Sequence, residues 1–217
     1  MFQTFSLYHV AYLAQAAQWT LLLSAIAFVG GGLLGAVLTL MRVSIFAPLR
    51  WIARIYVYLI QGTPLLVLLF IAYFGVSHLG FDLPAIVAAG IALTLYAAAF
   101  LADIWRGAIE AVGRGQWEGA DALGLSWPKA MRFVILPQGL RLAVPPTVGF
   151  SVQVVKNTAL ASVIGFIELT RAGQIVSNST FQPLSVYLTV AAFYFVICFA
   201  LSQTSRWLSA RMTVHAA

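Results

Sequence analysis

Long apolar stretches with almost no charge inside them constrain this chain more than any other feature. Five stretches are near the length that a helix needs to cross the ~30 Å hydrocarbon core of a bilayer. They cover residues 19–41, 55–76, 83–102, 142–167 and 184–202. Only 8% of all residues are charged, against roughly 25% in an ordinary globular domain. We therefore predict an all-α, multi-pass transmembrane helical bundle of about five spans.

The same composition excludes several classes of protein. Hydrophobic residues make up 62% of the chain, so a soluble monomer would expose apolar patches large enough to cause aggregation. The net charge of +6 is spread among apolar runs and does not form the clustered basic face that nucleic acid binding needs. A secretory signal is excluded because no basic residue precedes the first run, which is also too long. The single cysteine, Cys198, cannot form an intramolecular disulfide, and we interpret it as a buried hydrophobic residue.

The positions of the basic residues predict the orientation, because Lys and Arg concentrate in cytoplasmic segments. Most of them follow spans one and three or lie near the C-terminus, whereas Arg171 alone lies on the opposite side and Lys156 lies inside a span. The N-terminus is therefore predicted to be outside and the C-terminus cytoplasmic. Residues 1–18 are predicted to be an external interfacial lead-in, residues 19–208 the transmembrane domain, and residues 209–217 a cytoplasmic tail.

Two patterns concern packing. Gly31 and Gly35 form a small-xxx-small pair in the first span, which lets helix backbones approach closely, within one chain or between two. Asp103 and Arg106 are three residues apart where the third span ends, so their side chains can pair on a helix.

The segment Gln61-Gly62-Thr63-Pro64 interrupts the second stretch. Proline removes a backbone donor and glycine weakens a helix. Such a break is tolerated in a span where protein or a watery cavity covers the backbone. Gln61 and Thr63 are therefore candidate residues of a substrate pathway or gate, and a kink used only for packing is the alternative.

Lys156-Asn157-Thr158 lies inside the fourth stretch, with Lys156 roughly 21 Å from its start at helical rise. An unpaired ammonium at that depth is costly, so it faces the protein interior or water and indicates a substrate path. Lys156, Asn157 and Thr158 are therefore further candidates for the pathway. Alternatively, Lys156 reaches the outer interface or pairs with Glu168 as a structural contact.

Residues 116–137 lie between spans three and four and predict a helix, a tight turn and a second helix. Gly124 suits the left-handed residue after a helix end. Ser126 can cap the next helix, and Pro128 suits its first turn. We expect that helix to be disturbed at Pro137. This 116–137 loop would be presented to the cytoplasm as a docking element.

Glu118-Gly119-Ala120, followed by Gly124, Val134 and Leu136-Pro137, closely resembles the EAA loop of ABC importer permeases. Two other segments resemble the polar amino acid branch of that family: Gln61-Gly62-Thr63-Pro64-Leu65-Leu66 and residues 156–165. The resemblance extends from about residue 19 to the last span. Gly119 and Val134 stand where Ala and Ile are usual, and Gln61 stands where the branch often has Arg.

The resemblance implies a type I importer permease in a bacterial inner membrane. Two ABC ATPase subunits, with ATP and Mg²⁺ bound to them, would dock on the 116–137 loop. An external binding protein would deliver a polar amino acid, and a second copy or a sister permease would complete the pore. The coupling residues that the resemblance implies are Glu118, Gly119, Ala120, Asp121, Gly124, Val134, Leu136 and Pro137. The chain has no G-x-x-x-x-G-K-[ST] loop, so the energy of ATP would come from another polypeptide, and we expect no cofactor in this chain.

The sequence allows two alternatives to an importer permease. An intramembrane enzyme needs a nucleophile and base or a metal cluster, but His9, His78 and His215 are scattered and there is one cysteine, so we expect no catalytic or metal site. An ion-gradient-driven secondary amino acid transporter or channel is the better alternative. Such proteins usually have internal repeats and acidic residues within their spans, and here the acidic residues lie mostly outside the spans.

Overall fold

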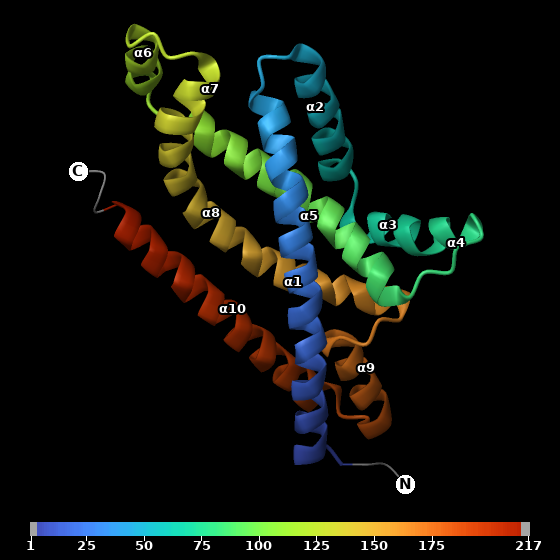
Figure 1. Ribbon diagram of the computed structural model, residues 1–217. Coiled ribbons are helices and arrows are strands. Elements are labelled where there is room, and N and C mark those ends of the chain that lie inside the picture. The colour runs from blue at the N-terminus through green and yellow to red at the C-terminus, as the bar shows by residue number, and fades with distance from the viewer. Residues whose placement is uncertain (1–3, 214–217) are drawn as a thin grey trace.

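The computed structural model describes residues 4–213, and all regular secondary structure in that range is helical (Figure 1). The helices are α1 (Leu7–Val43), α2 (Ala47–Gln61), α3 (Leu65–Phe70), α4 (Val76–His78), α5 (Ala85–Glu110), α6 (Arg114–Ala122), α7 (Trp127–Ala130), α8 (Leu136–Asn157), α9 (Leu169–Thr180) and α10 (Pro183–Thr213). Two π-helical turns, Ile71–Gly75 and Met131–Ile135, and a 3₁₀ segment, Thr158–Ile164, connect some of them. The predicted all-α bundle is confirmed.

Helices α1 and α5 pack closely and run parallel. A Cβ atom on Gly31 would lie 2.5 Å from Cβ of Ala97, and Gly35 is also in close contact with α5. Small residues allow this approach because no side chain separates the two backbones. Nearer to both C-terminal ends, Arg42 pairs with Asp103 at 2.7 Å. The glycine pair therefore serves packing within the chain.

Because α1 and α5 are parallel, the segment between them determines the number of membrane crossings. Four helical stretches in the described part are long and apolar enough to cross a membrane, and α2 with α3–α4 makes a fifth if the bent pair counts as one span. Two parallel spans need a connection that returns through the bilayer. We therefore assign the bent pair as one broken span, which gives five crossings.

The second span is not the straight crossing of residues 55–76 that the apolar run suggests. Helix α2 ends at Gln61, α3 begins at Leu65, and the two parts are bent by 100°. Figure 1 shows α3 and α4 pointing sideways from the bundle. The Gly62-Pro64 break causes this bend, because Pro64 lacks the amide that would continue the helical hydrogen bonds.

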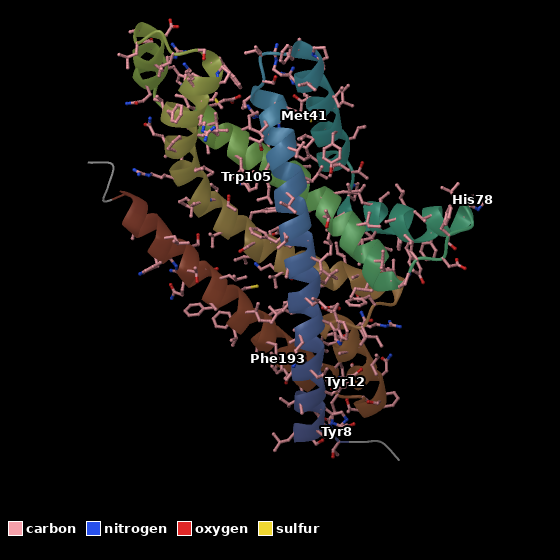
Figure 2. All side chains as sticks on the ribbon, in the orientation of Figure 1. Tyr8, Tyr12, Met41, His78, Trp105 and Phe193 are labelled. Carbon is pink, nitrogen blue, oxygen red and sulfur yellow. The ribbon has the colours of Figure 1, made fainter. Side chains whose placement is uncertain are left out.

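Helix α8 runs antiparallel to α5 and begins at the end of the 116–137 loop, which contains α6 and α7. Nε1 of Trp105 on α5 donates a hydrogen bond to Oγ1 of Thr147 at 2.8 Å. Nearer to the 116–137 loop, a Cβ on Gly139 would lie 3.2 Å from Cγ1 of Ile109. Figure 2 labels Trp105, which lies between α1 and α8. The fourth apolar stretch, 142–167, thus begins inside α8 and ends in the segment that leads to α9.

The two ends of the chain differ from the predicted segments. Helix α1 begins at Leu7, so residues 7–18 are the first turns of one long helix rather than a separate lead-in. Helix α10 continues to Thr213, so no helix end falls at residue 208. Residues 1–3 and 214–217 lie outside the described residues. The location of residues 1–18 at an outer membrane surface stays a prediction.

The central core joins the helices that carry the two polar interruptions. Leu65 and Leu69 of α3 share one buried cluster with Leu93 of α5, Val154 of α8 and Ile164 of the 3₁₀ segment. The segments that follow Thr63 and Thr158 are thus packed together, although they are almost a hundred residues apart in the sequence.

Candidate functional site

The 116–137 loop forms the predicted helix, tight turn and helix. Gly124 has a φ of 66°, a left-handed conformation that favours glycine because it has no Cβ. The amide of Leu125 donates to the carbonyl of Ala120 at 3.1 Å, which closes the end of α6. Ser126 occupies the N-cap of α7, but its hydroxyl makes no capping hydrogen bond. The backbone carbonyl of Ser126, rather than its side chain, accepts the bond from Lys129 at 2.9 Å.

The disturbance expected at Pro137 is present one turn earlier, as the π-helical turn Met131–Ile135. Pro137 has no amide hydrogen, so the carbonyl of Phe133 loses its usual α-helical donor. Nε2 of Gln138 donates to the carbonyl of Val134 at 2.8 Å and to Oε1 of Gln116 at 3.0 Å. The same side chain therefore connects α6 to the start of α8.

A small apolar core fixes the loop to the bundle. Ile109, Val112, Met131 and Ile135 are buried together, with Trp117 and Trp127 packed against them. This core also contacts the end of α1. Movement of the loop would therefore be transmitted to α1, α5 and α8, because packed apolar side chains move as a unit.

The outward surface of the 116–137 loop carries most of the residues predicted for coupling. Glu118, Gly119, Asp121, Gly124 and Pro137 are exposed, Val134 and Leu136 are half-buried, and Ala120 is buried. Two large apolar side chains are also exposed there, Leu123 at 79% and Phe133 at 66%. The loop also has an open groove of about 370 Å³, which is lined by Trp117, Glu118, Asp121, Leu125, Trp127 and Ala130. Exposed apolar groups beside carboxylates suit a protein partner.

The predicted pathway residues of the second span lie at the bend between α2 and α3. Gln61 is exposed, and Oγ1 of Thr63 donates to the carbonyl of Leu59 at 2.8 Å. Thr63 thus satisfies a carbonyl at the end of α2, where the helix leaves such groups without partners.

The predicted residues of the fourth span lie at the end of α8 and separate into two environments. Lys156 is exposed, whereas Thr158 is fully buried and donates to the carbonyl of Val155 at 2.7 Å. Gln153, which sequence reasoning missed, donates to Oδ1 of Asn157 at 2.9 Å. Gln153 is three and four residues from Lys156 and Asn157, and this helical spacing could have predicted that the three side chains share one face. Nδ2 of Asn157 is buried and has no hydrogen-bond partner among the described residues.

The pairing of Lys156 with Glu168 that the sequence allowed is absent from the described ion pairs. Glu168 is instead fully buried, and its carboxylate accepts bonds from Tyr194 at 2.8 Å and from the amides of Thr170 and Arg171 at 2.9 Å. These donors satisfy the carboxylate at the start of α9, so it has no need of the ammonium.

A charge network joins α1 to the end of α5. Asp103 accepts from Arg106 at 3.1 Å, as its spacing predicted, and from Arg42 at 2.7 Å, which the sequence did not indicate. Arg106 also pairs with Glu110. The four charges cancel, so the network fixes the two helix ends rather than attracting a charged ligand. No cluster of metal-ligating side chains occurs within residues 4–213.

Comparison with known proteins identifies the architecture. Residues 29–214 match the family described as the binding-protein-dependent transport system inner membrane component. The chain belongs to this family. It is therefore a multi-pass permease subunit of a bacterial inner membrane, and the resemblance found in the 116–137 loop is confirmed at the level of the family.

Relatives of this permease cover nearly its whole length. A probable amino-acid ABC transporter permease of Bacillus subtilis, YckA, is 38% identical over 86% of this chain and 83% of its own length. A probable glutamine ABC transporter permease of the same organism, GlnM, is 35% identical over 98% and 96%. A crystal structure of an amino acid ABC transporter with histidines has a TM-score of 0.91 and 33% identity, over 96% of this chain and 100% of that chain. The MetNI methionine ABC transporter, at 22% identity and a TM-score of 0.64, shares the fold.

Proposed function

We propose that this permease is the transmembrane subunit of an ATP-driven importer that carries a polar amino acid inward by alternating access. The observation that supports this most is the 116–137 loop, a helix–turn–helix with exposed Leu123 and Phe133 above a core continuous with α5 and α8. Such an element can transmit the movement of docked ATPase subunits to the bundle, which then switches between two packed arrangements. The substrates named for YckA and GlnM support an amino acid as cargo.

The partners follow from this assignment. Two ABC ATPase subunits would hold ATP and Mg²⁺ and dock on the 116–137 loop through Glu118, Gly119, Ala120, Asp121, Gly124, Val134, Leu136 and Pro137. A second copy or a sister permease would complete the pore, and an external binding protein would deliver the amino acid. Hydrolysis would occur on the ATPase subunits, so this chain would not be the catalytic one.

The orientation we propose has the N-terminus outside and the C-terminus in the cytoplasm. Figure 2 supports a common side for α6, α7 and Met41, with Tyr8 at the opposite end of α1. Arg42 lies in the last turn of α1, and Arg50 and Arg54 lie in α2 just after it. Basic residues are retained on the cytoplasmic side. The 116–137 loop would therefore meet the ATPase subunits where ATP is available.

The exposed side of α8 is our proposed part of the substrate pathway. Lys156 is exposed there beside the Gln153–Asn157 pair, and an ammonium next to amide groups can bind the carboxylate that every amino acid has. Gln61 and Thr63 would lie at the gate, since the chain bends by 100° at that point and Gln61 is exposed. Thr158 would support this end of α8 from inside the core.

Reconstitution tests the proposed function. The permease is placed in liposomes with ATPase subunits and a binding protein, and the uptake of labelled amino acids is measured with and without ATP. We expect concentrative uptake only with ATP and all partners. An ATPase variant that cannot hydrolyse ATP is the control. Concentrative uptake by the permease alone, driven by an ion gradient, would overturn the proposal in favour of a secondary transporter.

A further inference from the structure

Helix α2 leaves one apolar face uncovered. The helix packs into the bundle through Ala53 and Val57, which are buried with residues of α1 and α5. The opposite face carries five large side chains that are between 52% and 65% exposed: Trp51, Ile52, Ile55, Tyr58 and Leu59. These positions lie on one side of a helix, so they form a continuous apolar strip that runs from the α1–α2 turn toward the bend.

A basic ledge lies at the turn end of this strip, and we define it as Arg50, Trp51 and Arg54. The guanidinium carbon of Arg54 is 5.1 Å from the centroid of the Trp51 ring, which is within the range of a cation–π contact. Nη1 of Arg50 donates to the carbonyls of Ser44 and Ile45 at 2.8 and 2.9 Å. Both guanidinium groups are therefore held on one side of the helix, one turn apart.

Within residues 4–213, no carboxylate forms an ion pair with the ledge. The first acidic residue in the sequence is Asp82, and Asp103 already binds Arg42 and Arg106. In the part of the chain that the structure describes, neither Arg50 nor Arg54 forms an ion pair. Two cations without counter-ions, beside an exposed tryptophan at the end of a span, suit an anionic group at the depth of the lipid headgroups.

We propose that this ledge binds the phosphate of an anionic phospholipid, whose acyl chain lies along the apolar strip of α2. Arginine binds phosphate oxygens with two parallel N–H groups, and Trp51 fixes the plane of Arg54 for this contact. A soluble partner could reach the ledge but not the strip, which extends toward the middle of the bilayer. A second copy that covered the strip would add a further pair of unbalanced arginines.

Native mass spectrometry of the full-length permease tests the lipid site. The protein is equilibrated in bilayers of mixed phosphatidylcholine and phosphatidylglycerol, extracted, and the phospholipids that stay bound are counted. We expect the wild type to retain phosphatidylglycerol in preference to phosphatidylcholine. Because one basic residue at a membrane surface contributes about a fivefold preference for anionic lipid, Arg54→Gln should lower that retention about fivefold. Trp51→Ala should lower it less, and Arg54→Lys should restore part of it.

Arg141→Gln is the matched control, since Arg141 is an exposed arginine near the same end of the molecule. Its loss should leave phosphatidylglycerol retention unchanged. Equal losses of phosphatidylglycerol retention from Arg54→Gln and Arg141→Gln would mean that basic residues attract the lipid diffusely, and would overturn the site. A wild type that retains phosphatidylglycerol and phosphatidylcholine equally would also overturn it. If Arg54→Gln leaves lipid retention unchanged but weakens ATPase binding or alters the oligomeric state, the ledge binds a protein partner instead. Should Arg54→Gln fail to fold, insensitivity of wild-type retention to salt would also refute the proposal.

Discussion

The hydroxyl of Tyr194 on α10 donates a hydrogen bond of 2.8 Å to Oε2 of Glu168 at the start of α9. Thr20 on α1 approaches the same oxygen at 3.4 Å, and its own oxygen accepts from the amide of Leu169 at 3.1 Å. A fully buried carboxylate thus connects three helices at the end of the bundle opposite the 116–137 loop, where Figure 1 shows α9 beside the start of α1.

Tyr194→Phe should destabilise the permease, because it leaves a buried carboxylate with one donor fewer. We expect a loss of about 1–3 kcal/mol, measured as a lower midpoint of thermal unfolding in detergent. Tyr187→Phe is the matched control on the same helix, since Tyr187 is partly exposed and should tolerate the change. Equal midpoints for the two variants would show that the Tyr194 bond contributes nothing.

Gly31→Ala should weaken the packing of α1 on α5. The added Cβ would lie 2.5 Å from Cβ of Ala97, and overpacking of this kind costs about 1–3 kcal/mol. The neighbouring Gly32→Ala adds a methyl group whose nearest atom is 3.9 Å away, on Trp105, so it should be neutral or slightly stabilising. The stability of both variants is measured by the same unfolding assay. A tolerant Gly31→Ala would contradict the close approach.

Gly124→Val should uncouple ATP hydrolysis from transport if the 116–137 loop receives the ATPase subunits. A side chain at a φ of 66° costs about 1–2 kcal/mol, so the turn opens and α7 moves away from its place. In the assembled transporter we expect ATP hydrolysis to continue while uptake falls severalfold. Gly115→Val provides the comparison, because Gly115 lies in α6 with open space around it. Full uptake by the Gly124 variant would argue against docking at this turn.

Lys156→Met should raise the KM for the amino acid about tenfold or more, since a charge-assisted hydrogen bond to a carboxylate contributes about 1.5–3 kcal/mol. Lys156→Arg, which keeps the charge, should recover much of the affinity. The measurement is uptake by the reconstituted transporter over a range of amino acid concentrations. An unchanged uptake profile in the Met variant would mean that Lys156 only anchors α8 at the membrane surface.

Reporter fusions at His78 and Ser179 should both be external. Figure 2 places His78 at the tip of α4, after the bent pair, and Ser179 lies in α9. Both follow an even number of crossings from an external N-terminus, two for His78 and four for Ser179, if α2–α4 is a broken span. Fusions are assayed with a reporter that is active only outside the cytoplasm. A cytoplasmic signal at His78 would mean that the bent pair enters and leaves on the same side.

Sequence alone determined the class of the molecule, because hydrophobicity and the spacing of charges act locally. Long apolar runs favour lipid as their solvent, and Gly124 and Pro128 favour a turn and a helix start through their own backbone preferences. The helix, turn and helix of the 116–137 loop could therefore be predicted, but not the π-helical turn Met131–Ile135 or the missing side-chain cap of Ser126. The break at Gly62–Pro64 was also visible, but not its bend of 100°, since the direction of α3 depends on its packing against α5 and the 3₁₀ segment.

Only the tertiary structure decided which polar side chains meet. Glu168 binds Thr20 and Tyr194, far away in the chain, and no local pattern could indicate those partners in place of Lys156. Arg42 finds Asp103 for the same reason: α1 and α5 run parallel in a register fixed by glycine contacts. Local sequence sets which groups need a partner, whereas the packing of helices within the bilayer sets which partner is within reach.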